Sequence, residues 1–427
     1  MRVLVLGNGA REHALASRLS AERDVSDIVV APGNPGILAI ARTAPADLAD
    51  PGALLALAER EQIDFTIVGP ELPLSLGVAD RFIEEGRLIF GPTAAAARLE
   101  SSKAFAKAFM ARHRVPTARF LTCDTIEAAR SAVRSEAFGF PVVIKADGLA
   151  AGKGVVIAGD HAEAEEAIAA AMADRRFGDS GSRLVIEECL AGPEVSFFVI
   201  SDGTRTLPIG TAQDHKRIFD GDQGPNTGGM GAFAPSPLVT PALHGRIMRE
   251  VVGPVIAGMA AEGYPFRGFL YVGLILTADG PKVIEFNVRL GDPEAQVILS
   301  LIDEPLLPLL VAAASGSILQ HACRLSSDRL VGVVLASRGY PESAESGQPI
   351  AGVAEAERSP GVAVYHAGTR TANGQLVSAG GRVMTVVGRG DSFAQAVARA
   401  YAGLAHIHFD GMQYRRDIGQ KALTADP

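Results

Sequence analysis

Residues 142–157 read VVIKADGLAAGKGVVI and place two apolar runs on either side of a loop with three glycines. The β-branched residues of both runs predict the two strands of a hairpin. Lys145 lies at the end of the first strand, and Lys153 stands just before the second. A lysine is a mobile point charge suited to phosphate, and Gly152 and Gly154 would let backbone N–H groups approach a ligand. The stretch therefore predicts either a hairpin that folds over phosphates or a solvated hairpin tip that binds nothing.

The same loop does not match a Walker A phosphate-binding loop, which reads G-x-x-x-x-G-K-[ST]. Three residues, not four, separate Gly148 from Gly152, and Lys153 is followed by Gly154 instead of a serine or threonine. A P-loop is therefore excluded on both spacing and chemistry.

A second informative stretch is KVIEFNVRLGDPEAQ, residues 282–296. Alternate residues of a strand share a face, so Glu285, Asn287 and Arg289 are expected on one side of it. A carboxylate and an amide oxygen can hold one Mg²⁺ that bridges phosphates, and the arginine can neutralise developing phosphoryl charge. Asp292 and Glu294 are candidate supporting or substrate contacts. The alternative is an ordinary strand with a solvated polar face.

The first hundred residues alternate strands and helices, which predicts a doubly wound parallel sheet. Strands are expected at 2–6, 28–31 and 65–68, and a helix around 51–61. Glycine turns follow all three strands, at the edge where such sheets bind ligands. The first turn, GNGARE, has Glu12 where a dinucleotide fingerprint has its third glycine, so NAD binding is not expected. Binding of an anion at the helix N-terminus and a plain tight turn both remain open.

The rest of the chain falls into a strand-rich middle and a tail. Residues 101–113, SSKAFAKAFMARH, predict a helix with a serine N-cap, and further helices are expected near 161–173 and 241–262. The tail from about residue 328 predicts strands at 330–337, 361–368 and 382–390, then a helix at 392–405, as a separate small domain. Within the middle, Glu187, Leu190 and Glu194 could hold adenine and ribose, or the two acids could simply lie exposed on a loop. The polar segment 214–233 ends in a glycine-rich nest suited to carboxylates or phosphates.

Length and composition limit the classes of protein that remain. A chain of 427 residues suits two to four domains, and its net charge of −8 argues against nucleic acid as the main ligand. The three cysteines, far apart in the sequence, have neither metal-ligand nor disulfide spacing, which favours reduced thiols in the cytoplasm. The most apolar late stretch, PLLPLLVAAAS, is short and contains two prolines, so no membrane span is expected.

Taken together, these motifs resemble the ATP-grasp superfamily and, within it, the glycinamide ribonucleotide synthetase family. The resemblance covers nearly the whole chain, and the matching segments occur in family order: VLGNGAREHALA, VAPGNPG, IVGPE, IFGPT, SSKAFAK, VIKADGLAAGKGV, QDHKR, GPNTGGMGA and VIEFNVRLGDPE. One departure is Ala10, where many relatives carry glycine. The change leaves the first turn in place but bears on how closely a phosphate can approach.

The resemblance implies an α/β and α+β multidomain protein. Its parts would be a substrate-binding α/β domain at 1–102, an ATP-grasp domain at 103–327 with a mobile lid at about 117–190, and a small β-rich domain at 328–427. It also implies ATP-dependent ligation of glycine to 5-phosphoribosylamine through glycyl phosphate, the second step of de novo purine synthesis. The implied cofactors are ATP with Mg²⁺ or Mn²⁺, and the implied state is a cytoplasmic monomer with small-molecule partners only.

Residue roles follow from the same resemblance. Contacts to ATP are implied for Lys103, Lys145, Gly152, Lys153, Glu187, Leu190 and Glu194, with the last three at adenine and ribose. Metal ligands would be Glu285 and Asn287, and catalytic roles fall to Arg289, Asp214 and Lys216. Contacts to the other substrates are implied for Asn8, Gly9, Gly33, Asn34, Pro70, Glu71, Asp214, His215, Gly228, Gly229, Met230, Gly231, Arg289 and Asp292.

Two rival functions remain at this level. Another ATP-grasp ligase, of the biotin-carboxylase or formate-using kind, is disfavoured by the QDHKR and GPNTGGMGA segments, which resemble the glycine-using family. A non-catalytic nucleotide-binding regulator would not need the acid–asparagine–arginine strand, which is intact here.

Overall fold

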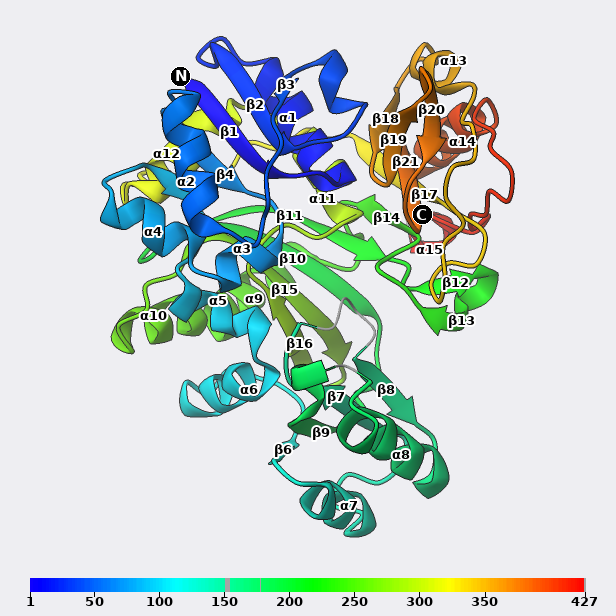
Figure 1. Ribbon diagram of the computed structural model, residues 1–427. Helices are drawn as coiled ribbons and strands as arrows, with labels where there is room; N and C mark the ends of the chain where they lie inside the picture. The colour runs from blue at the N-terminus through cyan, green and yellow to red at the C-terminus, as the bar shows by residue number, and fades with distance from the viewer. Residues whose placement is uncertain (150–153, 177, 426–427) are drawn as a thin grey trace.

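The computed structural model describes residues 1–149, 154–176 and 178–425 (Figure 1). Its N-terminal part is a five-stranded sheet in the order β3-β2-β1-β4-β5, and every pairing in it is parallel. The strands are β1 (Arg2–Gly7), β2 (Asp27–Pro32), β3 (Arg42–Thr43), β4 (Phe65–Val68) and β5 (Ile89–Phe90). The helices are α1 (Ala10–Ser20), α2 (Pro51–Arg60), α3 (Glu71–Ser75), α4 (Val78–Glu84) and α5 (Ala94–Ser101).

Both faces of this sheet are buried, as a parallel sheet requires. Val3 and Val5 belong to a hydrophobic cluster that includes α1. Leu4 and Leu6 belong to a second cluster that includes α2 and α4. The predicted doubly wound arrangement is therefore confirmed, and the carboxyl ends of its strands carry the glycine turns.

A second sheet is four-stranded and antiparallel, in the order β6-β9-β7-β8. It comprises β6 (Phe120–Cys123), β7 (Val142–Ala146), β8 (Val155–Ala158) and β9 (Leu184–Glu188), with helices α7 (Ile126–Arg134) and α8 (His161–Ile168). These elements have a hydrophobic cluster of their own and project from the rest of the molecule in Figure 1. The hairpin predicted from residues 142–157 is confirmed as β7–β8, with Lys145 opposite Val155.

The largest sheet has eight strands in the order β16-β15-β10-β11-β14-β17-β21-β18. Its strands are β10 (Glu194–Asp202), β11 (Thr206–Asp214), β14 (Gly231–Ala234), β15 (Arg267–Thr277), β16 (Gly280–Asn287), β17 (Arg329–Ala336), β18 (Val362–His366) and β21 (Arg382–Gly390). The other α-helices before the tail are α6 (Lys103–Arg112), α9 (Pro241–Ile247), α10 (Gly253–Ala261), α11 (Glu294–Ile298) and α12 (Leu306–Ala314). A π-helical turn at Met248–Val252 joins α9 to α10, so the helix predicted at 241–262 is confirmed.

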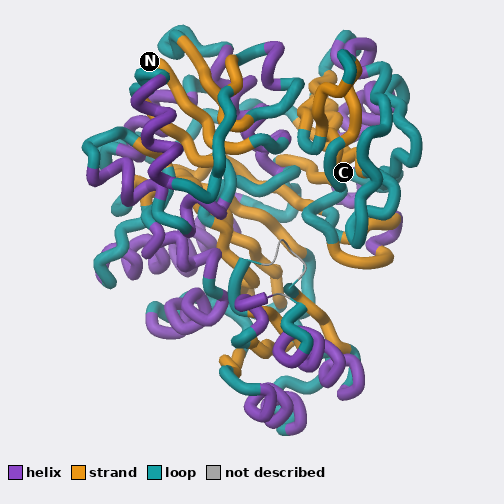
Figure 2. Tube along the Cα trace, viewed as in Figure 1, coloured by secondary structure: helices purple, strands orange, loops and turns teal. Residues whose placement is uncertain are grey.

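The tail joins this sheet instead of forming one by itself. Strand β17 pairs with β14, with Gly231 opposite Val333, and Phe233 packs among the apolar side chains of the tail. The three strands and the helix predicted for the tail are confirmed as β17, β18, β21 and α14 (Phe393–Leu404). The strand order therefore runs from the middle of the chain into the tail, and Figure 2 shows strands in both parts.

Two small hairpins and two short helices complete the strands and α-helices of the described residues. The hairpins are β12 (Arg217–Phe219) with β13 (Gln223–Asn226), and β19 (Thr369–Ala372) with β20 (Gln375–Ser378); the helices are α13 (Val353–Glu357) and α15 (Gln420–Ala425). Among the described residues, every helix is too short or too polar to cross a bilayer.

Candidate functional site

A cavity of about 840 Å³ lies where the four-stranded sheet, the large sheet and helices α5 and α6 meet. Most of the residues that the sequence singled out line it. These are Glu71, Lys103, Lys145, Glu187, Leu190, Glu194, Asp214, Lys216, Gly228, Glu285, Asn287, Arg289, Asp292 and Glu294. Residues from all parts of the chain thus reach one space, which is large enough for a nucleotide with a small second ligand.

The lysine side of the cavity is built on α6 and β7. Ser102 caps α6 by accepting a hydrogen bond from the Phe105 N–H, and its hydroxyl donates to Asp147, just past the end of β7. Lys103, the first residue of α6, donates to the carbonyl of Gly148 at 2.9 Å. Burial lowers the pKa of Lys103. Hydrogen bonds therefore join the hairpin to α6 at the place where Lys145 and Lys103 enter the cavity. The other two predicted ATP contacts in this loop, Gly152 and Lys153, lie outside the described residues.

Glu187 lies between two lysines. Its carboxylate is 2.8 Å from Nζ of Lys107 and 3.1 Å from Nζ of Lys145, and only 2% of the residue is exposed. Burial lowers the pKa of Lys107 to about 8, although Glu187 acts in the opposite direction. Sequence reasoning missed Lys107. The available signal was its place four residues after Lys103, which puts both ammonium groups on one face of a helix.

The opposite side of the cavity is one face of the large sheet. In its register Ser196 lies opposite Gly273, and Gly273 lies opposite Glu285. A Cβ added to Gly273 would be 3.1 Å from Cγ of Glu285, so the glycine leaves room for that carboxylate. Glu285 and Asn287 both line the cavity, together with their strand neighbours Ile284 and Phe286.

Cations surround Glu285. Lys216 Nζ lies 3.6 Å from its carboxylate and 2.9 Å from that of Glu194. Burial by itself would raise the pKa of Glu285, but Lys216, Lys145 and Lys103 hold it below its usual value. A carboxylate that stays ionised among positive charges is suited to a hard divalent ion and to the phosphates that the ion bridges.

The donor set fits a metal shared with a ligand. Among the described residues, no group of three or more His, Cys, Asp or Glu side chains could enclose a metal ion. Glu285 and Asn287 offer two oxygen donors at the cavity wall. Mg²⁺ commonly binds through one or two such groups and takes its remaining ligands from water and substrate phosphates. The residues present therefore fit Mg²⁺ or Mn²⁺ held jointly by the protein and a polyphosphate.

Two further carboxylates lie deep on the same wall. Burial raises the pKa of Asp214 to about 6, while Lys216 draws it down. Burial, and then the charge of Asp214, raise the pKa of Glu294 to about 7. Glu294 accepts a hydrogen bond from Ser196 at 3.4 Å. These acids can exchange protons near neutral pH or bind a cationic group of a ligand.

Arg289 connects the sheet to the N-terminal domain. It forms ion pairs with Glu71 at 3.0 Å and with Glu100 at 2.9 Å, and Glu100 also accepts the N–H of Val288. Although burial acts to raise it, the pKa of Glu71 falls to about 2 beside Arg289 and Arg11. Burial raises the pKa of Glu100, which sequence reasoning missed, to about 6. The guanidinium therefore faces the cavity already oriented by two acids.

Apart from Glu71, the residues of the N-terminal glycine turns that were predicted to contact substrates lie outside the lining of this cavity. Asn8, Gly9, Gly33, Asn34 and Pro70 do not line the cavity. The amide of Asn34 donates to the carbonyls of Asn8 and His366, which fastens the turn to the tail. Gly9 lies close to the cavity wall, because a Cβ built on it would be 3.4 Å from Oδ2 of Asp292.

The side chain of Glu12 fills the space between these turns. It accepts the N–H of Gly9 at 2.7 Å, and a Cβ added to Gly69 would collide with it. The residue that breaks the dinucleotide fingerprint thus closes the strand edge where a dinucleotide would bind.

The glycine-rich segment after Asp214 contributes backbone more than side chains. Gly228 lines the cavity, whereas Gly229, Met230 and Gly231 do not. Met230 is fully buried among apolar neighbours. His215 is also buried, with its ring 5.9 Å from that of Phe233, and its ring nitrogens have no hydrogen-bond partner among the described residues. Burial, then the charge of Arg415, lower the pKa of His215 to about 4. The ring is therefore a neutral part of the packing behind the cavity wall.

Comparison with known proteins identifies one family along the chain. Domain models of the phosphoribosylglycinamide synthetase family match residues 1–100 (N domain), 101–295 (ATP-grasp (A) domain) and 330–421 (C domain). The phosphoribosylamine–glycine ligase of Xanthomonas axonopodis pv. citri is 50% identical over 430 residues, which cover 100% of this chain and 99% of the relative. The corresponding ligase of Ralstonia nicotianae is 49% identical over 427 residues, with 99% and 100% covered.

Solved structures agree with these sequence matches. The crystal structure of phosphoribosylamine–glycine ligase from Thermotoga maritima superposes with a TM-score of 0.84 at 34% identity, covering 98% of this chain and 100% of that one. The biotin carboxylase domain of Hydrogenobacter thermophilus 2-oxoglutarate carboxylase, solved with Mg-ADP and bicarbonate, gives a TM-score of 0.74 at 19% identity, covering 97% and 91%. Because its identity is only 19%, the second match shows similarity of fold alone. With its three domain models matched in order and half of its residues shared with named ligases, the chain belongs to the phosphoribosylglycinamide synthetase family.

Proposed function

We propose that this chain is an ATP-dependent ligase that joins glycine to 5-phosphoribosylamine, giving glycinamide ribonucleotide, ADP and phosphate in the second step of de novo purine synthesis. The observation that carries the proposal is the meeting of Lys103 and Lys145 with Glu285 and Asn287 across one cavity. Two cations and two oxygen donors placed in this way can hold the two sides of a metal-bound polyphosphate.

The division of the cavity follows from its walls. The lysines of α6 and β7 bind the phosphates of ATP, and Glu187, Leu190 and Glu194 bind its adenine and ribose. Glu285 and Asn287 hold Mg²⁺ or Mn²⁺, which when bound would neutralise phosphate charge. Glycine and phosphoribosylamine bind on the side lined by Asp214, Glu294, Arg289 and Asp292.

The chemistry needs no covalent enzyme nucleophile. A carboxylate is a poor electrophile, so ATP first phosphorylates glycine to glycyl phosphate. The amine of phosphoribosylamine then attacks the acyl carbon, and inorganic phosphate leaves. Lys103, Lys145 and Arg289 stabilise the negative charge that moves between phosphoryl oxygens. The four-stranded sheet acts as a lid that excludes water, which would otherwise hydrolyse the acyl phosphate.

Several finer features belong to the same proposal. Domain boundaries are proposed at 102/103 and 327/328, with the lid at about 117–190. The chain is proposed to act as a monomer on small molecules, without nucleic acid. A cytoplasmic location is proposed because all three cysteines are free thiols.

The test is an assay of phosphate release. The full chain is incubated with ATP, Mg²⁺ and one carboxylic acid at a time, with and without phosphoribosylamine. Phosphate should appear only with glycine and phosphoribosylamine together, and bicarbonate or formate should not replace glycine. Bicarbonate-dependent release would instead indicate a carboxylase-like ligase, and ATP binding without turnover would indicate a regulator.

Replacement of a metal ligand provides the matched variant. Glu285→Ala should abolish Mg²⁺-dependent phosphate release while the circular dichroism spectrum stays unchanged, because the side chain lies at the cavity wall and not in a core. Glu345→Ala, at an exposed surface ion pair with Arg338, should behave like the wild type. Normal turnover by the Glu285 variant would refute the metal assignment.

A further inference from the structure

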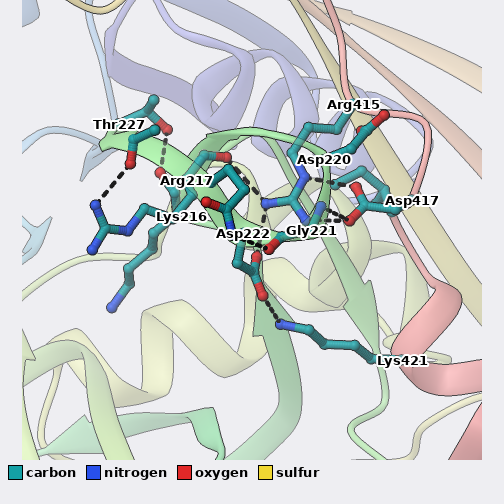
Figure 3. A network of polar contacts seen from close by, with 12 residues as sticks. Lys216, Arg217, Asp220, Gly221, Asp222, Thr227, Arg415, Asp417 and Lys421 are labelled. Atoms are coloured by element: carbon teal, nitrogen blue, oxygen red, sulfur yellow. Dashed lines mark hydrogen bonds and ion pairs between the residues drawn. The ribbon is translucent and has the colours of Figure 1, made fainter.

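Residues 415–421, near the end of the described chain, are fastened to the β12–β13 hairpin beside the cavity (Figure 3). Arg415 is at the centre of this attachment. Its side chain has no exposed surface, and it is the largest fully buried side chain of the protein's described part. A buried guanidinium is costly unless all its donors are paired, so its partners show what it holds in place.

The guanidinium binds the tail on one side and the hairpin on the other. Nε and Nη2 donate to the two oxygens of Asp417 at 2.7 and 2.6 Å. Nη1 donates to Oδ1 of Asp222 at 2.8 Å and to the carbonyl of Arg217 at 3.1 Å. One arginine therefore joins the first strand and the turn of the hairpin to the end of the chain, as Figure 3 shows.

Three further contacts fix the turn of the hairpin. Asp417 also accepts the N–H of Gly221 at 2.9 Å, and Asp220 accepts the N–H of Arg416 at 2.7 Å. Lys421 forms an ion pair with Asp222 at 2.7 Å. Gly221 and Asp222 both have positive φ, 69° and 55°. A left-handed aspartate is uncommon, and here two cations, from Arg415 and Lys421, hold its side chain.

The hairpin is part of the cavity wall, whereas Arg415 is not. Arg217, Asp222, Asn226 and Lys421 line the cavity. Lys216 directly precedes the hairpin, and its carbonyl accepts both the N–H and the hydroxyl of Thr227, which directly follows it. The base of the hairpin therefore sets the backbone position from which Lys216 reaches Glu194 and Glu285.

We propose that Arg415 is a positioning residue for the ligase reaction: from behind the cavity it holds the 217–226 hairpin, and through it Lys216, against the acids that face the substrates. The proposal rests on the proposed function only for the identity of the substrates. The competing interpretation is an arginine that only stabilises the fold.

Kinetics separate these two roles. If Arg415 only stabilises the fold, its loss lowers the folded fraction and the activity per total protein in proportion, while kcat and KM of the folded molecules stay unchanged. A positioning role predicts that KM for glycine or phosphoribosylamine rises about tenfold or more, because small displacements of reacting groups are costly. The dissociation constant of ATP should rise by a smaller factor, because Lys216 contacts Glu194 and Glu285 but the phosphate contacts of ATP come from α6 and β7 on the other side.

The experiment uses the full chain and three variants. Arg415→Met removes the guanidinium, and Asp417→Asn is a milder change that keeps the shape of the attachment if the first variant folds poorly. Arg338→Met is the control, because Arg338 also lies in the C-terminal part and forms ion pairs, with Glu345 and Asp410, but does not contact the hairpin. The measurements are KM and kcat per folded molecule, ATP affinity by calorimetry, and amide hydrogen exchange of residues 217–226.

The expected result is raised KM together with faster exchange of 217–226 in the Arg415 and Asp417 variants, with the Arg338 variant unchanged. Unchanged KM values in both variants, or unchanged exchange of the hairpin, would overturn the proposal. A wild-type chain that releases no phosphate with glycine and phosphoribosylamine refutes the proposed function instead. In that case a rise of about tenfold in hairpin exchange still supports the anchoring role, and unchanged exchange refutes it.

Discussion

Lys107 and Glu187 form a buried ion pair, yet replacing each of them is expected to have opposite consequences. The pKa of Lys107 falls from the usual 10.5 to about 8, with burial as the main cause. One pKa unit corresponds to about 1.4 kcal/mol, so the fold bears a cost of about 3 kcal/mol for keeping this ammonium protonated at pH 7. Because only 3% of the side chain is exposed, solvent screening does not reduce that figure.

Lys107→Met removes the cost and keeps most of the volume. Glu187 retains Lys145 at 3.1 Å, and the hydroxyl of Thr117, which accepts from Lys107, still donates to the carbonyl of Val283. The free energy of unfolding is therefore expected to stay within about 1 kcal/mol of the wild type or to rise. Glu187→Gln instead leaves two buried ammonium groups without their carboxylate and should cost about 3 kcal/mol or more.

The assay is urea unfolding followed by circular dichroism, at pH 7 and at pH 10. Since the folded pKa of Lys107 lies below the unfolded value, the unfolded chain binds more protons between about pH 8 and 10.5, and this group makes the wild type more stable as pH rises through that window. The Lys107→Met variant should lack this gain. Equal loss of stability in the Lys107 and Glu187 variants at pH 7 would refute the reasoning, because the lysine charge would then stabilise the fold.

Two other predictions concern groups that link the parts of the chain. Arg289→Met should lower the free energy of unfolding by about 3 kcal/mol, because Glu71 and Glu100 lose their shared cation; thermal unfolding measures this, and an unchanged midpoint would contradict it. Burial, then the charge of His366, lower the pKa of His13 from 6.5 to about 3, so the unfolded chain binds more protons below pH 6.5. The free energy of unfolding should therefore fall by up to about 5 kcal/mol between pH 6.5 and 3. His13→Gln keeps an acceptor for the His366 N–H and should show a shallower fall in acid unfolding curves. Curves of equal slope for the variant and the wild type would show that another group titrates.

Patterns within a few residues could be recognised from the sequence because they depend only on local backbone geometry. Glu285 and Asn287 alternate with buried Phe286 wherever a strand forms, so their shared face could be predicted. Ser102 caps α6 through its own neighbour Phe105. The hairpin around Lys145 and the alternating strands and helices of the first hundred residues follow in the same way from β-branched runs and glycine turns.

Contacts between distant segments depended on packing, and the sequence contains no local sign of them. Asn34 was expected to bind a ligand, but its amide donates to His366, 332 residues away. The ring of His215, just past the end of β11, packs 5.9 Å from the ring of Phe233 and is buried, although it was expected to contact a substrate.

The sequence by itself determined the elements, the strand that carries Glu285 and Asn287 and, by resemblance, the reaction. Only the tertiary structure decided that Lys107 forms an ion pair with Glu187, that β17 extends the large sheet, and that Arg415 binds the β12–β13 hairpin behind the cavity. Each of these contacts joins segments that lie roughly 80 to 200 residues apart in the sequence. Such pairings are selected by the free energy of packing the whole chain, which no short stretch of sequence contains.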